Sequence, residues 1–237
     1  MTGNYKAICL KAVDYDENDK MLLLFTAEAG KVSARIKGVK KPTAKLKFCA
    51  QPFCFGEYEL TEKFSRHTII NCLEIESFSA LSKNVDAYYC GSVMLEFCSI
   101  ALQEGESNVQ LFLLLLNSLK RLTEISPQLV LIKFLLQALK IVGFGLDFSQ
   151  CTNCQNKNYS TLYLDLVVGG TICPDCTIDA VYQLSPAETT CFKMVDQTPY
   201  DRLQVLKYEN RYQGMLRALN KYLEVFLKKL NSLQFLI

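Results

Sequence analysis

Cys151-Thr152-Asn153-Cys154, followed later by Cys173-Pro174-Asp175-Cys176, gives the chain two Cys-x-x-Cys pairs. The 18 residues between the pairs are typical of a four-cysteine zinc site. Each pair can direct two thiolates at one ion, and four thiolates complete the tetrahedral shell that zinc prefers. We therefore predict that these four cysteines bind Zn²⁺. Two disulfide bonds or four unrelated buried thiols are the alternatives.

The residues between the two pairs predict a small zinc ribbon. Leu162, Leu164 and Leu166 occupy every second position, which is the period of a β-strand. Gly169-Gly170 then supplies a hairpin turn, and Thr171-Ile172 leads into the second pair. A shell of four cysteines leaves no open coordination position for water or substrate. We therefore expect the metal to stabilise the fold and not to take part in catalysis.

The first eighty residues predict β structure without a long helical pattern. Alternation is clearest from Lys31 to Lys37, where Val32, Ala34 and Ile36 share one face. The other predicted strands cover residues 5–15, 21–26, 53–60 (with a bulge at Gly56) and 67–75. Five short strands in so short a segment favour a small closed barrel such as the OB-fold.

The pattern changes to helical spacing from Val85 onward. The predicted helices cover residues 85–105, 109–122, 127–142 and 211–233. Ser185-Pro186-Ala187-Glu188 predicts the N-cap of a further helix. Because helices on both sides of the ribbon must bury apolar faces against each other, the ribbon is predicted to be an insertion. The expected fold class is α+β, with an OB-fold barrel at 1–80, a helical domain at 81–146 and 183–237, and the inserted Cys₄ zinc ribbon at 147–182.

Composition excludes several classes of protein. Half of the residues are hydrophobic and 21% are charged, which is typical of a globular chain. Eleven cysteines, with no signal-peptide pattern at the start, predict a reducing cytoplasmic compartment. The apolar run 111–116 is too short to cross a bilayer, and segment 129–146 carries Lys133, Gln137 and Lys140 on one helix face. The cysteines outside the two pairs are expected to be small buried hydrophobes: Cys9, Cys49, Cys54, Cys72, Cys90, Cys98 and Cys191.

The sequence offers no set of residues for catalysis. The one histidine, His67, begins a predicted strand and is interpreted as a surface or packing residue. Neither a Gly-x-x-x-x-Gly-Lys phosphate loop nor a Gly-x-Gly-x-x-Gly turn is present. We therefore expect a binding protein and not an enzyme.

Residues 31–47 contain seven basic side chains and no acidic one. Phosphate backbones bind such clusters largely regardless of base sequence. The segment therefore predicts nucleic-acid binding, and an ordinary solvated face is the alternative. Tyr5, Tyr15, Phe48 and Phe53 are candidates for stacking on bases, although each is favoured as a core residue. The predicted nucleic-acid contacts are Lys31, Arg35, Lys37, Lys40, Lys41, Lys45 and Lys47.

The chain resembles the bacterial recombination mediator RecO over essentially its whole length. The resemblance lies in an ordered set of motifs: Gly30-Lys31-Val32-Ser33, Lys37-Gly38-Val39-Lys40-Lys41, Gly143-Phe144-Gly145-Leu146-Asp147 and the four cysteines of the two pairs. The resemblance implies a cytoplasmic, nucleoid-associated protein that binds single- and double-stranded DNA. It also implies strand annealing and, together with RecR, loading of RecA onto DNA coated by single-strand-binding protein. The acidic tail of single-strand-binding protein is then an expected ligand of the helical domain.

Two other functions are compatible with the same residues. One is a zinc-stabilised scaffold whose main ligand is another protein. The other is an RNA-binding OB-fold protein, which would use the 2′-hydroxyl group to discriminate RNA from DNA.

Overall fold

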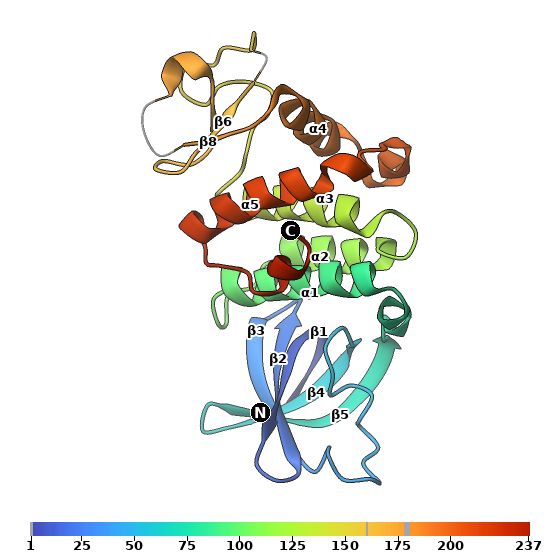
Figure 1. Cartoon of the computed structure of the whole chain (residues 1–237). Helices are drawn as coiled ribbons and strands as arrows, with labels where there is room; N and C mark the ends of the chain where they lie inside the picture. The colour runs from blue at the N-terminus through green and yellow to red at the C-terminus, as the bar shows by residue number, and fades with distance from the viewer. Residues whose placement is uncertain (1, 160, 178–180) are drawn as a thin grey trace. The chain divides into compact units, whose positions relative to one another are not determined.

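The structure, a computed structural model, describes residues 2–159, 161–177 and 181–237. Five strands form a closed barrel in the order β1-β2-β3-β5-β4, and β4 returns to pair with β1. Every pairing is antiparallel except that of β3 with β5. The predicted OB-like barrel is thus confirmed (Figure 1). Its strands are β1 (Thr2–Tyr15), β2 (Asp19–Thr26), β3 (Gly30–Ile36), β4 (Phe55–Lys63) and β5 (Arg66–Glu76).

The strand boundaries differ from the prediction at several ends. β1 begins at Thr2, ahead of the expected start, because its first residues pair with the far end of β4 in the register Thr2↔Thr61. Such a long-range partner leaves no mark on the local alternation of the sequence. The bulge expected at Gly56 is confirmed by a register shift between Phe55 and Gly56.

The barrel core is made by the inward residues of alternating strands. Val32, Ala34 and Ile36 are buried as predicted, and Tyr58 is fully buried with its hydroxyl donating to the Cys49 carbonyl oxygen at 3.0 Å. Burial raises the pKa of the Cys9 thiol, so the group stays protonated. The seven cysteines outside the two pairs are all buried, as expected of small hydrophobic residues.

The chain divides into two compact units: Met1–Lys83 with Leu95–Lys120, and Asn84–Met94 with Arg121–Ile237. The second part of α1 (Val85–Ala101) and most of α2 (Val109–Arg121) therefore belong with the barrel. Phe112 of α2 contacts Phe25 and Phe55 edge-on, with ring centroids 5.4 and 6.1 Å apart. α2 thus covers aromatic side chains that face outside the barrel core.

The loop that follows α1 also packs against the turn between β2 and β3. Gly30 has φ of +67°, and a Cβ atom there would lie 2.0 Å from the carbonyl oxygen of Glu106. The amide of Gly105 donates to the Lys31 carbonyl oxygen at 3.3 Å, and the Ser107 hydroxyl donates to the Ala27 carbonyl oxygen at 3.1 Å. Only glycine satisfies both the conformation and the space at position 30.

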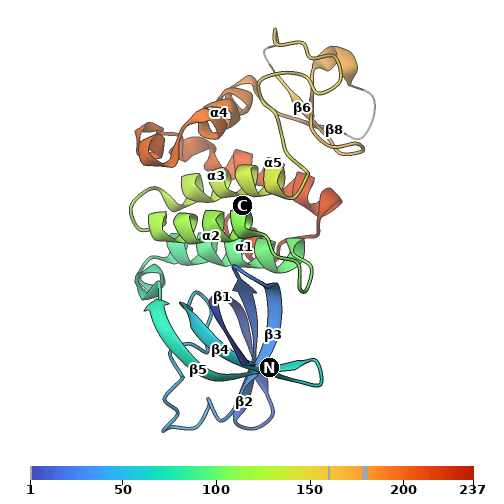
Figure 2. The same ribbon diagram turned by 180° about the vertical axis from the view of Figure 1, so that it is seen from behind.

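The second unit contains α3 (Pro127–Ile141), α4 (Pro186–Gln197) and α5 (Tyr212–Phe226), and α3 packs against both of the others. Seen from behind in Figure 2, α3 and α5 run side by side and α4 lies next to the ribbon strands. The N-cap predicted at Ser185 is confirmed, because its hydroxyl accepts from the Glu188 amide while the Glu188 carboxylate accepts from the Ser185 amide. The 3₁₀ turns are η1 (Ser79–Lys83), η2 (Pro174–Cys176), η3 (Tyr200–Val205), η4 (Glu209–Arg211) and η5 (Ser232–Phe235).

The last helix is shorter than predicted. α5 ends at Phe226, and Leu227 leaves the helical region with φ of −124° and ψ of −91°. Leu230 and Leu233 nevertheless remain buried, with 1% and 0% of their surface exposed. The predicted helix was too long because the spacing of apolar residues indicates which side chains are buried. It does not indicate where the backbone hydrogen bonds of the helix end.

The polar stripe predicted on α3 faces α4. Lys133 is 2% exposed, and its ammonium donates to the carbonyl oxygens of Val195 and Asp196 at 3.0 and 2.7 Å. These carbonyls belong to the last turn of α4, where the helix dipole favours a cation. Lys140 pairs with the Asp196 carboxylate at 2.7 Å. Burial lowers the pKa of Lys133.

None of the helices within the described ranges is long and apolar enough to span a membrane.

Gly30→Ala is expected to lower the free energy of unfolding by about 2–4 kcal/mol, because a left-handed non-glycine backbone and a steric clash both add cost. Urea unfolding measures the change. Gly105→Ala is the matched control, since Gly105 also has positive φ (+74°) but nothing lies within 4 Å of its Cβ position. Equal losses in the two variants would contradict the role of the Glu106 contact.

Lys133→Ala is expected to destabilise the chain by about 3 kcal/mol, because it removes two charge-assisted hydrogen bonds from buried carbonyls. Lys140→Ala removes the ion pair between the Lys140 ammonium and the Asp196 carboxylate. Because the Lys140 side chain is exposed, this loss should cost less than about 1 kcal/mol. Thermal unfolding of the two variants compares them directly. A larger loss for Lys140→Ala would show that the carboxylate pair, and not the capping of α4, holds the two helices together.

Candidate metal centre and nucleic-acid interface

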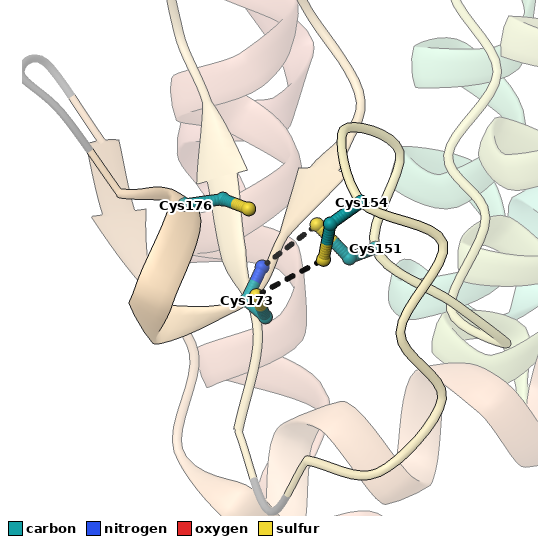
Figure 3. Close-up of side chains that lie close together, drawn as sticks. All are labelled: Cys151, Cys154, Cys173 and Cys176. Carbon is teal, nitrogen blue, oxygen red and sulfur yellow. Dashed lines mark hydrogen bonds between the residues drawn. The ribbon is translucent and has the colours of Figure 1, made fainter.

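The four cysteines of the predicted zinc site lie together in the second unit. Their Sγ atoms are all within 4.8 Å of one another, and those of Cys154 and Cys173 are 3.7 Å apart (Figure 3). A Zn–S bond of about 2.3 Å places the corners of a tetrahedron about 3.8 Å apart. The four thiols therefore fit a tetrahedral metal ion of the size of zinc.

Backbone amides favour the thiolate form of Cys151. Burial alone would raise the pKa of this thiol, but amide groups of Cys154, Cys173 and Asn153 act against burial and lower the pKa to about 6. The Cys173 amide donates to the Cys151 Sγ atom at 3.3 Å. Because a metal binds the thiolate, this donor arrangement suits a metal ligand better than an inert buried thiol.

Short strands hold the two cysteine pairs in register. β6 (Tyr163–Asp165) pairs with β7 (Thr171–Ile172), which confirms the predicted hairpin. β8 (Val181–Gln183) adds a third strand on the other side of β6. The sequence does not predict β8, because three residues are too few for alternation to be recognised. Cys173 is the N-cap of the 3₁₀ turn η2, which begins at Pro174, and Cys176 is its last residue.

Tyr222 of α5 fixes the ribbon hairpin to the helices. Its hydroxyl accepts from the Gly170 amide at 3.0 Å and donates to the Phe144 carbonyl oxygen at 3.3 Å. A Cβ atom at Gly169 would lie 3.0 Å from the same hydroxyl, and one at Gly170 would lie 2.8 Å from the Thr152 hydroxyl. The two glycines are therefore needed both for their positive φ and for close packing.

A second contact ties the ribbon to α4. The Phe148 ring stacks on Phe192 with centroids 4.8 Å apart and planes 7° apart. The Leu162 amide donates to the Thr189 hydroxyl at 3.2 Å. A metal ion that orders the two cysteine pairs would therefore also order the packing of α4 and α5.

The seven basic residues predicted to bind nucleic acid lie in different surroundings. The Lys31 ammonium donates to the carbonyl oxygens of Ser99 and Leu102 at 2.9 and 2.6 Å, at the C-terminal end of α1. Lys47 donates to the Pro42 carbonyl oxygen at 3.2 Å. The side chains of Lys37, Lys41 and Lys45 are exposed, and among the described residues they form no ion pair.

Acidic residues of the β1–β2 hairpin neutralise part of the basic segment. Arg35 pairs with Asp16 and Asp19 at 2.7 and 2.5 Å, and Lys40 pairs with Asp14 at 2.7 Å. The Gly38 amide donates to Asp19, and this bond together with Arg35 lowers the pKa of the Asp19 carboxyl. These ion pairs join residues about twenty positions apart in the sequence. The register of the β2–β3 hairpin, had it been predicted, would have indicated that these acids lie close to Arg35.

The same region contains an open cavity of about 450 Å³. Its lining includes Lys20, which lies outside the basic segment and is absent from the residues predicted from the sequence. Lys40 and Lys47 share the cavity with Lys20, and Asp14 is the acid among them. The concentration of cations is therefore larger at this cavity than the sequence segment alone indicates.

The four candidate aromatic residues separate into core and surface. Phe53 is 6% exposed, and Tyr5 and Phe48 pack partly buried against the barrel core, as favoured. Tyr15 is 42% exposed, and the Arg35 guanidinium lies 5.0 Å from the centre of its ring. His67 is half-buried in β5, opposite Glu62 of β4, and takes part in barrel pairing.

A closed five-stranded barrel, followed by helices that carry a four-cysteine ribbon, defines a two-part α+β protein with an OB-like N-terminal part. The model for the N-terminal part of recombination protein O matches residues 1–78, and the model for its C-terminal part matches residues 82–234. The chain therefore belongs to the recombination protein O (RecO) family.

Curated relatives agree over nearly the full length. The DNA repair protein RecO of Clostridium novyi (strain NT) is 32% identical over 94% of this chain and 87% of its own length. The DNA repair proteins RecO of Caldicellulosiruptor saccharolyticus and Clostridium perfringens are 28% and 29% identical. These matches cover 94% and 97% of this chain, and 93% and 95% of the relatives.

Cys154→Ser or Cys173→Ser is expected to abolish stoichiometric zinc binding and to lower the melting temperature, because the remaining three thiolates cannot close the shell. Zinc content after dialysis and thermal unfolding measure the two effects. Cys191→Ala, outside the cluster, should retain zinc. A variant that lost zinc but kept its full stability while losing DNA binding would instead place the ribbon in the binding site.

Proposed function

We propose that this protein is a DNA-binding recombination mediator that anneals complementary single strands. Together with RecR, it helps to load RecA onto DNA coated by single-strand-binding protein. It acts in the cytoplasm, in association with the nucleoid, and changes no covalent bond. The proposal rests on the family of the chain, whose curated relatives are DNA repair proteins. The exposed side chains of Lys37, Lys41 and Lys45 on the barrel support it.

Electrostatics supplies a mechanism for annealing. Two complementary strands repel each other through their phosphates, and a cationic surface lowers that repulsion by releasing condensed counterions. The exposed lysines of the β3–β4 loop supply charge without prior disruption of an ion pair. Arg35 and Lys40 would exchange a carboxylate partner for a phosphate, so the acidic hairpin competes with DNA for these two groups.

Lys31 has a structural role in this proposal. Its ammonium is occupied by two carbonyl oxygens of the first unit, and its removal would disturb the end of α1 before it affected DNA. Lys20 takes its place as a candidate phosphate contact, because it shares a cavity with Lys40 and Lys47.

We further propose that the bound metal is Zn²⁺ and that its role is structural. The observed thiol spacing supports this, as does the lowered pKa of Cys151. When bound, zinc would supply folding free energy to the ribbon through Cys151, Cys154, Cys173 and Cys176. The contacts of Tyr222 and Phe148 would pass that stabilisation to α5 and α4.

A cavity of about 520 Å³ in the second unit is a poor match for an acidic peptide. It is lined by polar and aromatic side chains, including Gln128, Tyr212 and Phe235, and its charged side chain is the acidic Asp86. A carboxylate-rich tail would be repelled by Asp86. The proposed contact with single-strand-binding protein is therefore not assigned to this cavity.

Charge reversal of Lys37 and Lys41 to Glu is expected to weaken single-stranded DNA binding. It should also reduce the salt dependence by about 0.7 in log–log slope for each phosphate that the protein no longer neutralises. Fluorescence anisotropy at several salt concentrations measures both effects, and an annealing assay with and without single-strand-binding protein follows the activity. Lys193→Glu with Lys207→Glu is the control, because it applies the same charge change to exposed residues of the second unit.

Unchanged DNA binding in the barrel variant would remove the barrel edge from the proposed interface. Equal affinity for DNA and for a neutral polymer would favour the alternative function, a zinc-stabilised scaffold whose main ligand is another protein. A consistent preference for RNA in matched oligonucleotides would favour the RNA-binding alternative.

A further inference from the structure

The turn between β4 and β5 has a conformation that its residues disfavour. Phe64 and Ser65 form a two-residue hairpin loop closed by the pair Lys63↔Arg66, and both have positive φ, +50° and +57°. Two-residue loops of this kind strongly prefer Asn-Gly or Asp-Gly, because side chains with a Cβ atom are strained there. A bulky aromatic residue at the first loop position therefore does not serve the stability of the turn.

Phe64 also contributes no packing to the barrel. Its side chain is 88% exposed, more than any other large apolar residue in the part of the chain that the structure describes. The Lys63 ammonium lies 5.5 Å from the centre of its ring. Arg66 on the other side of the turn is exposed as well. The tip of the hairpin is thus an aromatic face between two cations.

The hairpin emerges next to the outer face of β3. β5 pairs in parallel with β3 in the register Ala34↔His67 and Arg35↔Thr68, so β5 leaves the turn beside the outward-facing Ser33 and Arg35 of β3. Figure 1 shows the turn extending beyond the wall of the barrel. In OB-folds the face of the second and third strands, with the loops that join strands 1–2 and 4–5, is where oligonucleotides bind.

We propose that the β4–β5 hairpin is a contact site for single-stranded DNA, in which Phe64 stacks on an unpaired base and Lys63 and Arg66 bind the flanking phosphates. This inference rests on the proposed function, because it assigns a second contact to the DNA-binding barrel. Stacking on an aromatic ring tolerates any base, since every base has a π-face. Bases inside a duplex are already stacked, so the site selects unpaired strands and releases them once annealing is complete.

The first experiment uses a fluorescent reporter at the proposed contact. The chain contains no tryptophan, so Phe64→Trp introduces a single indole at the tip of the hairpin. Addition of an oligo(dT) strand should quench its emission, whereas inorganic polyphosphate should not, because polyphosphate binds cations without stacking. Quenching by neither probe, or equally by both, overturns the stacking assignment.

The second experiment separates the ring from the fold. Phe64→Asn removes the ring and places a residue suited to positive φ in the turn, so the unfolding midpoint should stay the same or rise. Affinity for oligo(dT), measured by anisotropy with labelled DNA, should fall about five- to tenfold, while affinity for a duplex of equal length should change less than about twofold. Phe235→Ala is the control for loss of another exposed ring, which is 67% exposed in the second unit.

The outcomes distinguish the hairpin from the function on which it rests. If the unmodified chain binds oligo(dT) and Phe64→Asn binds equally well, the hairpin assignment fails while the proposed DNA-binding function stands. Equal losses for single strands and duplex would also reject stacking, because that pattern indicates a displacement of the neighbouring Lys63 and Arg66 and not the loss of a stacked base. If the unmodified chain binds no DNA, both proposals are wrong.

Discussion

The contact of the β2–β3 turn with the loop after α1 is the constraint on which the first unit depends. Gly30 brings the two backbones together, and the Lys31 ammonium then completes the hydrogen bonding of α1 by binding the carbonyl oxygens of Ser99 and Leu102. A cation at the C-terminal end of a helix is favoured by the helix dipole as well as by the two orphan acceptors. Lys31, the first residue of the basic segment, therefore stabilises the fold. Among the described residues of that segment, the exposed lysines without an ion pair begin at Lys37.

The ribbon in the second unit also depends on specific polar contacts. Its strands are short, so contacts with other segments stabilise them more than their own backbone hydrogen bonds do. β6, β7 and β8 together contain too few residues to be stable alone. The four thiols and the Tyr222 hydroxyl supply the missing constraints, one set within the ribbon and the other between the ribbon and α5. A bound metal would therefore act on the helices without contacting them.

Charge on the barrel surface is balanced more closely than its basic segment indicates. Asp14, Asp16 and Asp19 of the β1–β2 hairpin pair with Arg35 and Lys40. The pairs that involve the exposed Asp14 and Asp16 contribute little to stability. In the proposed function their effect on binding would be greater, because the carboxylates reduce the field that a phosphate meets. The exposed lysines of the β3–β4 loop and the cations at the β4–β5 turn would then be separate points of contact along one strand of DNA.

The barrel, the helices and the cluster of four cysteines could be predicted from the sequence, because alternation, helical period, capping residues and ligand spacing are local patterns. Val32, Ala34 and Ile36 are buried as their period requires, and Ser185 caps α4 as its motif requires. Four features depend on long-range contacts and became visible only in the folded chain: the role of Lys31, the acids opposite Arg35, the burial of Lys133 and the end of α5. Nothing in a local pattern reveals which carbonyl or carboxylate, tens of positions away, will meet a given ammonium, because that depends on how whole elements pack.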